Sequence, residues 1–131
     1  MDQVAAAQFA NFMGRFYQNM ATQVGDTLHQ RIGTISDDQT AVLMGDQARL
    51  ISYAQTFYSL SDKIAFDGAD DYFKKVQDAT AAINEALKHI DKVDKVINIS
   101  ANVIAMAGGL ASKNTSMMVT ALTALKGEVG L

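Results

Sequence analysis

The chain has 131 residues, the length of one domain, and it contains no proline, no cysteine and no tryptophan. The absence of cysteine excludes disulfides, thiol catalysis and thiolate metal sites, and the absence of proline permits unusually long helices. The formal net charge of −3 argues against a nucleic-acid-binding protein, because neutralising phosphates requires a basic face. We therefore expect a single domain over residues 1–131 that does not bind nucleic acid.

The N-terminal segment lacks the pattern of a cleaved signal peptide, because no basic stretch precedes an apolar core. The chain also has no run of eighteen or more strictly apolar residues. These features predict a protein that is cytoplasmic or is secreted without a cleaved signal peptide, and that has no ordinary membrane anchor.

Aromatic and methionine side chains predict a first helix from near Asp2 to Gly33. They recur at the i, i+3, i+4, i+7 spacing of one helix face, at Phe9, Phe12, Met13, Phe16, Tyr17 and Met20. Gly25 could break this helix, but the apolar register continues past it. Gly33 suits the left-handed position that follows a helix end.

A capping box predicts the start of a second helix, because Ser36 is followed three residues later by Gln39. We expect this helix to continue to about Ala65. It carries one apolar series with a seven-residue period, Leu43, Leu50, Phe57 and Ile64. A neighbouring series flanks the first one, at Met44, Ile51 and Tyr58.

A longer seven-residue repeat predicts a third helix from about Asp70 to Ala107. Isoleucine or valine occupies its first position, at Val76, Ile83, Ile90, Ile97 and Ile104. A small or slim residue follows three positions later, at Ala79, Ala86, Val93, Ser100 and Ala107. Such a helix would be a rod of roughly 57 Å.

Gly108 and Gly109 are expected to end the third helix, and a short fourth helix is expected from Thr115 to about Lys126. The predicted fold class is therefore all-α, an elongated antiparallel bundle of three long helices plus a short C-terminal helix.

Three candidate ligand sites have simpler explanations. Glu85 and His89 are four residues apart, which is not the Glu-x-x-His spacing of di-iron bundles, and His29, the other histidine, has no such partner. Asp67, Asp70 and Asp71 do not match a calcium loop and suit helix capping. The two glycines before Lys113 lack the order of a phosphate-binding loop. We therefore expect no catalytic, cofactor or metal site and no enzyme activity.

The distribution of charge points to contact surfaces instead. From Gln3 to Gly25 the single charged residue is Arg15, and from Val96 to Leu125 it is Lys113. Helices this poor in charge lack the solvated face of an isolated surface helix, so we expect another polypeptide to cover them.

Composition also supports assembly. The chain is rich in Ala, Asn, Gln, Thr and Ser and lacks Pro, Cys and Trp, and in this it resembles the secreted helical filament and needle proteins of bacterial surfaces. The resemblance is one of composition and implies self-assembly through helix packing.

The sequence therefore predicts a non-enzymatic interaction or assembly protein that forms a homo-oligomer or binds a helical protein partner. The residues expected at the contact are Phe9, Phe16, Ile97, Ile104, Met117 and Met118. Two alternatives remain. Residues 96–125 could form a hairpin that enters a bilayer, as in pore-forming helical proteins, although Asn98, Ser100 and Asn102 oppose insertion. The chain could also be a small neutralising or chaperone-like subunit for one cognate protein.

Overall fold

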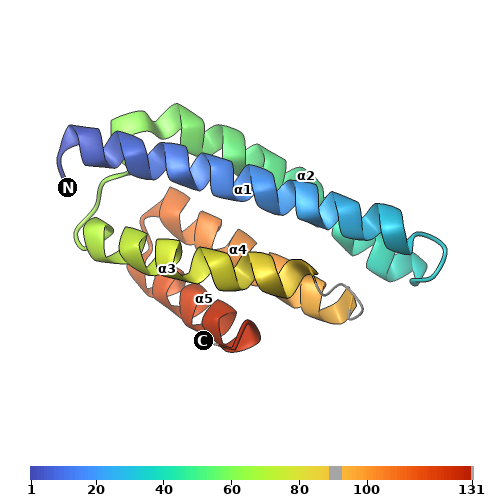
Figure 1. Ribbon diagram of the computed structural model, residues 1–131. Helices are drawn as coiled ribbons and strands as arrows, with labels where there is room; N and C mark the ends of the chain where they lie inside the picture. The colour runs from blue at the N-terminus through green and yellow to red at the C-terminus, as the bar shows by residue number, and fades with distance from the viewer. Residues whose placement is uncertain (89–92, 131) are drawn as a thin grey trace.

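The computed structural model describes residues 1–88 and 93–130, and in these residues it contains α-helices, one short 3₁₀ helix and no strand (Figure 1). The predicted all-α class is confirmed. The elements are α1 (Gln3–Arg31), α2 (Asp37–Leu60), η1 (Ser61–Ile64), α3 (Ala69–Lys88), α4 (Val93–Ser112) and α5 (Thr115–Glu128). The first and the last of the four expected helices follow the expected ranges closely, whereas the second is shorter and the expected third helix does not match.

α1 and α2 form a long antiparallel hairpin (Figure 1). The Asp2 side chain caps α1 by accepting a hydrogen bond of 2.7 Å from the backbone N–H of Ala5. Gly33 lies in the connecting turn with a φ of 86°, in the left-handed region that a glycine adopts without strain. The capping box at α2 is confirmed, because Ser36 and Gln39 exchange two hydrogen bonds of 3.0 Å. Local sequence signals therefore fix both ends of this turn.

The second helix is shorter than the sequence predicts. α2 ends at Leu60 instead of continuing to about Ala65, and Ser61 adopts a φ of 50° before the 3₁₀ turn η1. The turn directs the buried Ile64 toward the core, so the apolar series of the second helix is completed by a different element.

The expected third helix is two helices. α3 ends at Lys88 and α4 begins at Val93, and α4 runs back in the opposite direction (Figure 1). Ile90 and His89, which the sequence placed on the continuous helix, lie outside the described residues. A rod of roughly 57 Å would project beyond α1, which is about 44 Å long, and part of its apolar seam would remain in water. Two shorter helices each pack an apolar face into the core of the bundle.

The buried register also shifts within the predicted seam. In α3 the expected positions Val76, Ala79 and Ile83 are buried. In α4 the expected positions Ile97 and Ile104 are half-buried, and the core is formed instead by the series one residue earlier, which includes Val96, Ile99, Val103, Met106 and Leu110. Both series have a seven-residue period, so the sequence pattern alone does not decide between them.

Gly108 and Gly109 lie inside α4 and do not end it, which corrects the prediction. A Cβ atom at Gly109 would lie 2.9 Å from the backbone nitrogen of Met118, so this glycine lets α5 approach α4 closely. α4 ends instead at Ser112. Lys113 follows with a φ of 55°, and its N–H donates to the Leu110 carbonyl over 3.2 Å.

The buried apolar side chains of all five helices form one core. Phe9 on α1 stacks on Phe73 of α3 with ring centroids 4.7 Å apart, and the hydroxyl of Tyr17 donates to the Val103 carbonyl of α4 over 2.6 Å. α1 therefore contacts both later helices through its aromatic face.

Candidate functional site

The residues predicted at an interaction surface divide into two groups in the structure. Phe9, Phe16 and Met118 are buried in the chain's own core and are not available to a partner in this fold. Ile97 and Ile104 are half-buried against that core, and Met117 is exposed. The apolar stripe of the first helix is thus covered from within the chain, because α2, α3 and α4 pack on it. The structure does not bring the six residues together as one surface.

A different set of large apolar side chains is exposed along α2. Met44 is 58% exposed, Ile51 is 45% exposed and Tyr58 is 41% exposed, and these residues are seven positions apart. The parallel series Leu43, Leu50 and Phe57 is fully buried. The sequence contained both series, and nothing in their spacing shows which one faces the core and which faces water.

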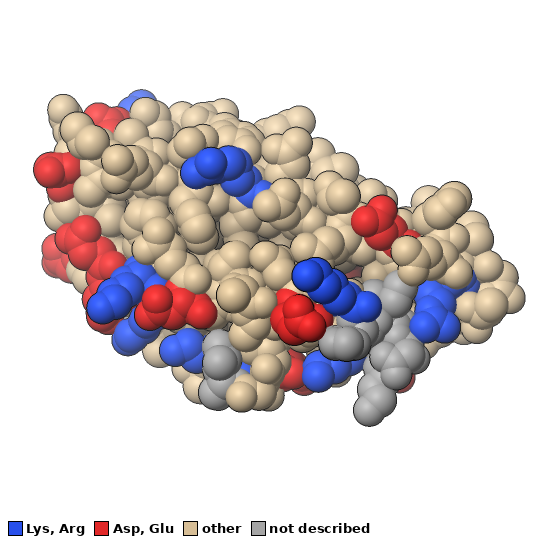
Figure 2. Space-filling model, viewed as in Figure 1, with Lys and Arg blue, Asp and Glu red and all other residues tan. Residues whose placement is uncertain are grey.

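Around Ile51 the α2 surface is uncharged. Within Thr40–Ser59, which the structure describes in full, the charged residues are Asp46 and Arg49. At about 100° per residue they lie on the order of 140–160° around the helix from Ile51. We call the surface formed by Met44, Gln47, Ala48, Ile51, Gln55 and Tyr58 the Ile51 face. In Figure 2 the visible surface over α1 and α2 carries few charges, whereas lysine, arginine, aspartate and glutamate gather over α3 and the lower edge.

A groove of about 370 Å³ runs between α1 and α2 along the edge of the Ile51 face. Its lining is formed by amide, hydroxyl and apolar side chains: Gln18, Ala21, Thr22, Gln47, Ile51, Ala54, Gln55 and Tyr58. The Tyr58 hydroxyl donates to Oε1 of Gln18 over 3.2 Å, so the two helices share one continuous surface here.

Two glycines of α1 allow side chains of α2 to approach it closely. A Cβ atom at Gly14 would lie 2.7 Å from the Tyr58 ring, and one at Gly25 would meet the Gln47 amide. Because neither glycine has a side chain, Tyr58 and Gln47 lie against the α1 backbone. The geometry provides an uncharged two-helix platform with amides that can donate and accept hydrogen bonds.

The opposite face of α2 contains a buried carboxylate. Asp46 is 6% exposed and lies on the same side of the helix as Leu43 and Leu50. Burial raises the pKa of Asp46, and the positive charge and hydrogen bond of Arg49, 3.2 Å away, offset part of that rise. The ion pair lies at the edge of the core, since most of the Arg49 side chain is exposed.

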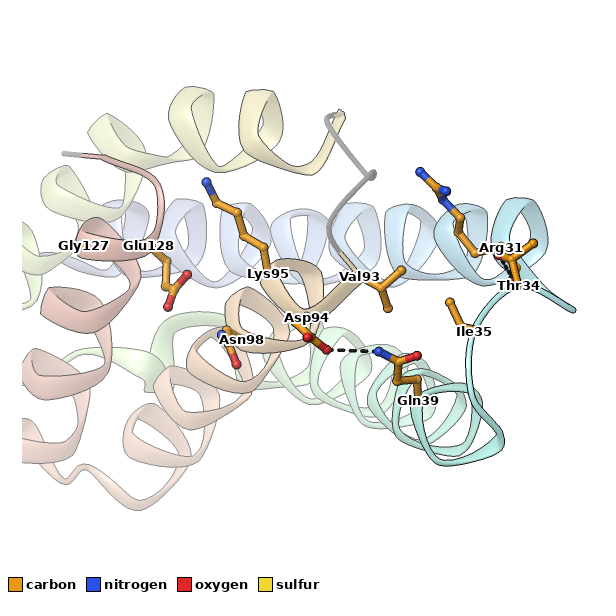
Figure 3. A pocket seen from close by; sticks show the side chains of 10 residues that line it. All are labelled: Arg31, Thr34, Ile35, Gln39, Val93, Asp94, Lys95, Asn98, Gly127 and Glu128. Carbon is orange, nitrogen blue, oxygen red and sulfur yellow. Dashed lines mark hydrogen bonds between the residues drawn. The ribbon is translucent and has the colours of Figure 1, made fainter.

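A larger polar hollow of about 700 Å³ lies where the end of α1 and the start of α2 meet α4 and the end of α5 (Figure 3). Its lining includes the cations Arg31 and Lys95 and the carboxylates of Asp94 and Glu128. Nε2 of Gln39 donates to Oδ1 of Asp94 over 3.1 Å and links α2 to α4 across the hollow. A lining with both charge signs does not select a ligand of one sign.

The candidate metal residues are dispersed. Asp70 lies 3.4 Å from the N-terminal amine, and Asp71 lies 3.0 Å from Lys75. His29 is exposed at the end of α1, and His89 is outside the described residues. Within residues 1–88 and 93–130 no three His, Asp or Glu side chains are grouped as metal ligands. In the same residues, no helix has both the length and the apolar character needed to cross a bilayer.

Comparison with known proteins found no matching family model, no similar curated protein and no similar solved structure.

Proposed function

We propose that this chain is a non-enzymatic interaction or assembly protein that works by burying a weakly charged helix face against another polypeptide. The observation that carries this proposal is the row of exposed Met44, Ile51 and Tyr58 on α2. Exposed apolar residues scattered singly need no explanation, but these three lie on one helix stripe on an uncharged surface.

Met44, Ile51 and Tyr58 have the seven-residue spacing that is typical of the contact between two packed helices. Apolar residues seven positions apart, with further contacts three or four positions away, form the seam of a helix pair. The exposed Ala48 supplies a small side chain that lets a second backbone approach, and Gln47 and Gln55 supply hydrogen-bonding amides at the rim. This combination suits a protein surface better than a small-molecule cavity, because the exposed apolar residues form a row along the helix and do not line an enclosed pocket.

The exposed face on α2 differs from the contact surface that the sequence predicts. Phe9, Phe16 and Met118 are core residues, so a partner would not meet them without unfolding the bundle. The Ile51 face replaces them, and the predicted mechanism, helix-on-helix burial of a weakly charged face, is retained.

A photo-crosslinking amino acid tests this proposal directly. We would replace Met44 with p-benzoylphenylalanine in the full chain, irradiate cells that express it, and look for a discrete covalent adduct. The matched control carries the same amino acid at Asp78, an exposed position on α3. A discrete protein adduct at position 44 and none at position 78 is the expected result. Equal or no crosslinking at the two positions would contradict an interaction role for this face.

A further inference from the structure

A second groove, of about 250 Å³, lies between the start of α3 and the length of α5. α5 follows α4 through a tight turn and runs in the same direction as α3 (Figure 1). The lining of the groove extends along α5 from Thr115 to Lys126, which are eleven positions apart. At 1.5 Å per residue this is a length of about 16 Å. A groove of this length and volume is narrow.

The middle of the groove is apolar. Its walls are Phe66 and Tyr72 on one side and Val119 and Leu122 of α5 on the other. The rings of Phe66 and Tyr72 meet edge to face, with centroids 6.0 Å apart. Tyr72 adds no polar atom to this surface, because its hydroxyl oxygen is buried. Val119 is 53% exposed, so a ligand that covers it would remove apolar surface from water, which favours binding.

The charged residues of the groove leave one lysine without a counter-ion. The amine of Lys75 lies 3.0 Å from a carboxylate oxygen of Asp71, so these two charges offset each other. Lys126 is half-buried, and among the described residues it makes no ion pair. The exposed Asp67 precedes α3, and the shared direction of α3 and α5 places it at the end of the groove away from Lys126. The Lys126 end therefore favours an anion.

We propose that this groove binds one linear acyl chain whose carboxylate head lies at Lys126. The volume of about 250 Å³ is below the roughly 300–1,000 Å³ of most small-molecule pockets, so the groove suits a slim single chain and not the paired chains of a phospholipid. The apolar walls cover the chain, and the ammonium group of Lys126 offsets the charge of the head. This site lies apart from the Ile51 face and does not depend on the proposed function.

Isothermal titration calorimetry of the full chain tests the chain and the head separately. Decanoate, below the concentration at which it forms micelles, is expected to bind about tenfold more tightly than octanoate, because two more methylene groups leave water. Decanol has the same chain without the charge. Lys126→Gln is expected to weaken decanoate binding about threefold to fivefold and to leave decanol binding unchanged, because the lost contact is an ion pair near the surface.

A substitution in the apolar middle tests the location of the site. Val119→Glu would place a carboxylate where the acyl chain lies, so we expect it to weaken decanoate binding at least about tenfold. Val42→Glu is the matched control, because Val42 is a valine of α2 that is 43% exposed and lies outside the groove. It is expected to leave the affinity unchanged. Circular dichroism checks that each variant remains helical.

Four results would overturn the proposal. The first is a wild-type chain that binds phosphatidylglycerol vesicles but not decanoate, or that binds neither. The second is equal affinity for octanoate and decanoate. The third is an equal loss of decanoate binding in Val119→Glu and Val42→Glu, which would indicate unspecific adsorption of the ligand. The fourth is an equal loss of decanol and decanoate binding in Lys126→Gln, which would exclude a carboxylate head at this lysine.

Discussion

The hydroxyl of Tyr17 on α1 donates a hydrogen bond of 2.6 Å to the backbone carbonyl of Val103 on α4, and both residues are fully buried. This bond joins segments that are 86 positions apart in the chain. Tyr72, on α3, has a buried hydroxyl as well, but this hydroxyl has no hydrogen-bond partner among the described residues. Two tyrosines of one core thus differ in whether their polar atom is satisfied.

Removing the two hydroxyl groups should therefore have opposite consequences. Tyr17→Phe is expected to lower the free energy of unfolding by about 1–2 kcal/mol, because it breaks a buried hydrogen bond and leaves its acceptor short of a partner. Tyr72→Phe is expected to be neutral or stabilising, because it removes an unsatisfied polar atom. Urea unfolding followed by circular dichroism measures both. Equal losses in the two variants would contradict the assigned hydrogen-bond pattern.

The same tyrosines predict loss of stability in alkali. Burial raises the pKa of Tyr17 well above its ordinary value, with further contributions from Tyr72 and Tyr53, and burial also raises the pKa of Tyr72. Above a pH of about 10 the unfolded chain releases tyrosine protons that the folded chain retains. Stability is therefore complete below that pH and falls above it, by up to about 1.4 kcal/mol per pH unit for each group.

Urea titrations at a series of alkaline pH values check this expectation. The double variant with Tyr17→Phe and Tyr72→Phe is expected to show a shallower decline than the wild type. If the wild type and the double variant decline in parallel, the buried tyrosines do not cause the loss.

Two glycine substitutions are expected to act in opposite directions. Gly109→Ala should destabilise the chain by about 1–3 kcal/mol, because its Cβ would meet the Met118 side chain and backbone at 2.7 and 2.9 Å and force α5 away from α4. Gly45→Ala, inside α2, should stabilise by up to about 1 kcal/mol, because alanine favours a helix and the nearest atom, of Arg49, is 3.5 Å away. Thermal unfolding of both variants measures the difference. A stabilising effect of Gly109→Ala would show that the α4–α5 contact is not as close as described.

The features that the sequence predicted correctly are the local ones. The capping box at Ser36 and Gln39 and the glycine turn at Gly33 depend on hydrogen bonds and dihedral angles within a few residues. The sequence predicts these two features because they do not depend on contacts with distant residues. The sequence also predicts that the first helix continues through Gly25, because the apolar register of the helix does not change there.

The sequence pattern alone does not predict the break between α3 and α4. The seven-residue series through Ile97 and Ile104 is regular, but the equally regular series through Val96 and Val103 is the one that enters the core. Which of them is buried depends on the position of the α1–α2 hairpin. The sequence predicts a helix end at Gly108 and Gly109, whereas the close approach of Met118 to Gly109 is a tertiary contact that has no local signal.

The candidate surface was missed for a related reason. An apolar stripe on a helix indicates that other residues pack on it, but the sequence does not show whether those residues belong to the same chain or to a partner. Phe9 and Phe16 are covered from within, whereas Met44 and Ile51 are not. The sequence shows the series Met44, Ile51 and Tyr58 on the second helix, but only the packing of α1 against α2 shows that this series stays exposed to solvent.

Asp46 provides a pH-dependent test of the fold. Burial raises its folded-state pKa above the value in the unfolded chain, and Arg49 only partly offsets that rise. The folded chain therefore binds a proton at a higher pH than the unfolded chain, so this carboxyl group adds stability as the pH falls through its folded pKa and loses that contribution as the pH rises again. Asp46→Asn removes the desolvated charge and leaves the exposed Arg49 in solvent. We expect it to raise the free energy of unfolding at neutral pH by about 1 kcal/mol.

The pH profile distinguishes this cause from a general effect of removing a negative charge. The gain from Asp46→Asn should shrink as the pH is lowered, because the wild-type carboxyl group then becomes neutral in the folded state. Asp78→Asn, at an exposed carboxylate of α3, is the matched control for removing a negative charge. Urea unfolding of the three proteins between neutral and acidic pH measures the gain. A gain that stays constant with pH, or that appears equally in Asp78→Asn, would show that the burial of Asp46 is not its cause.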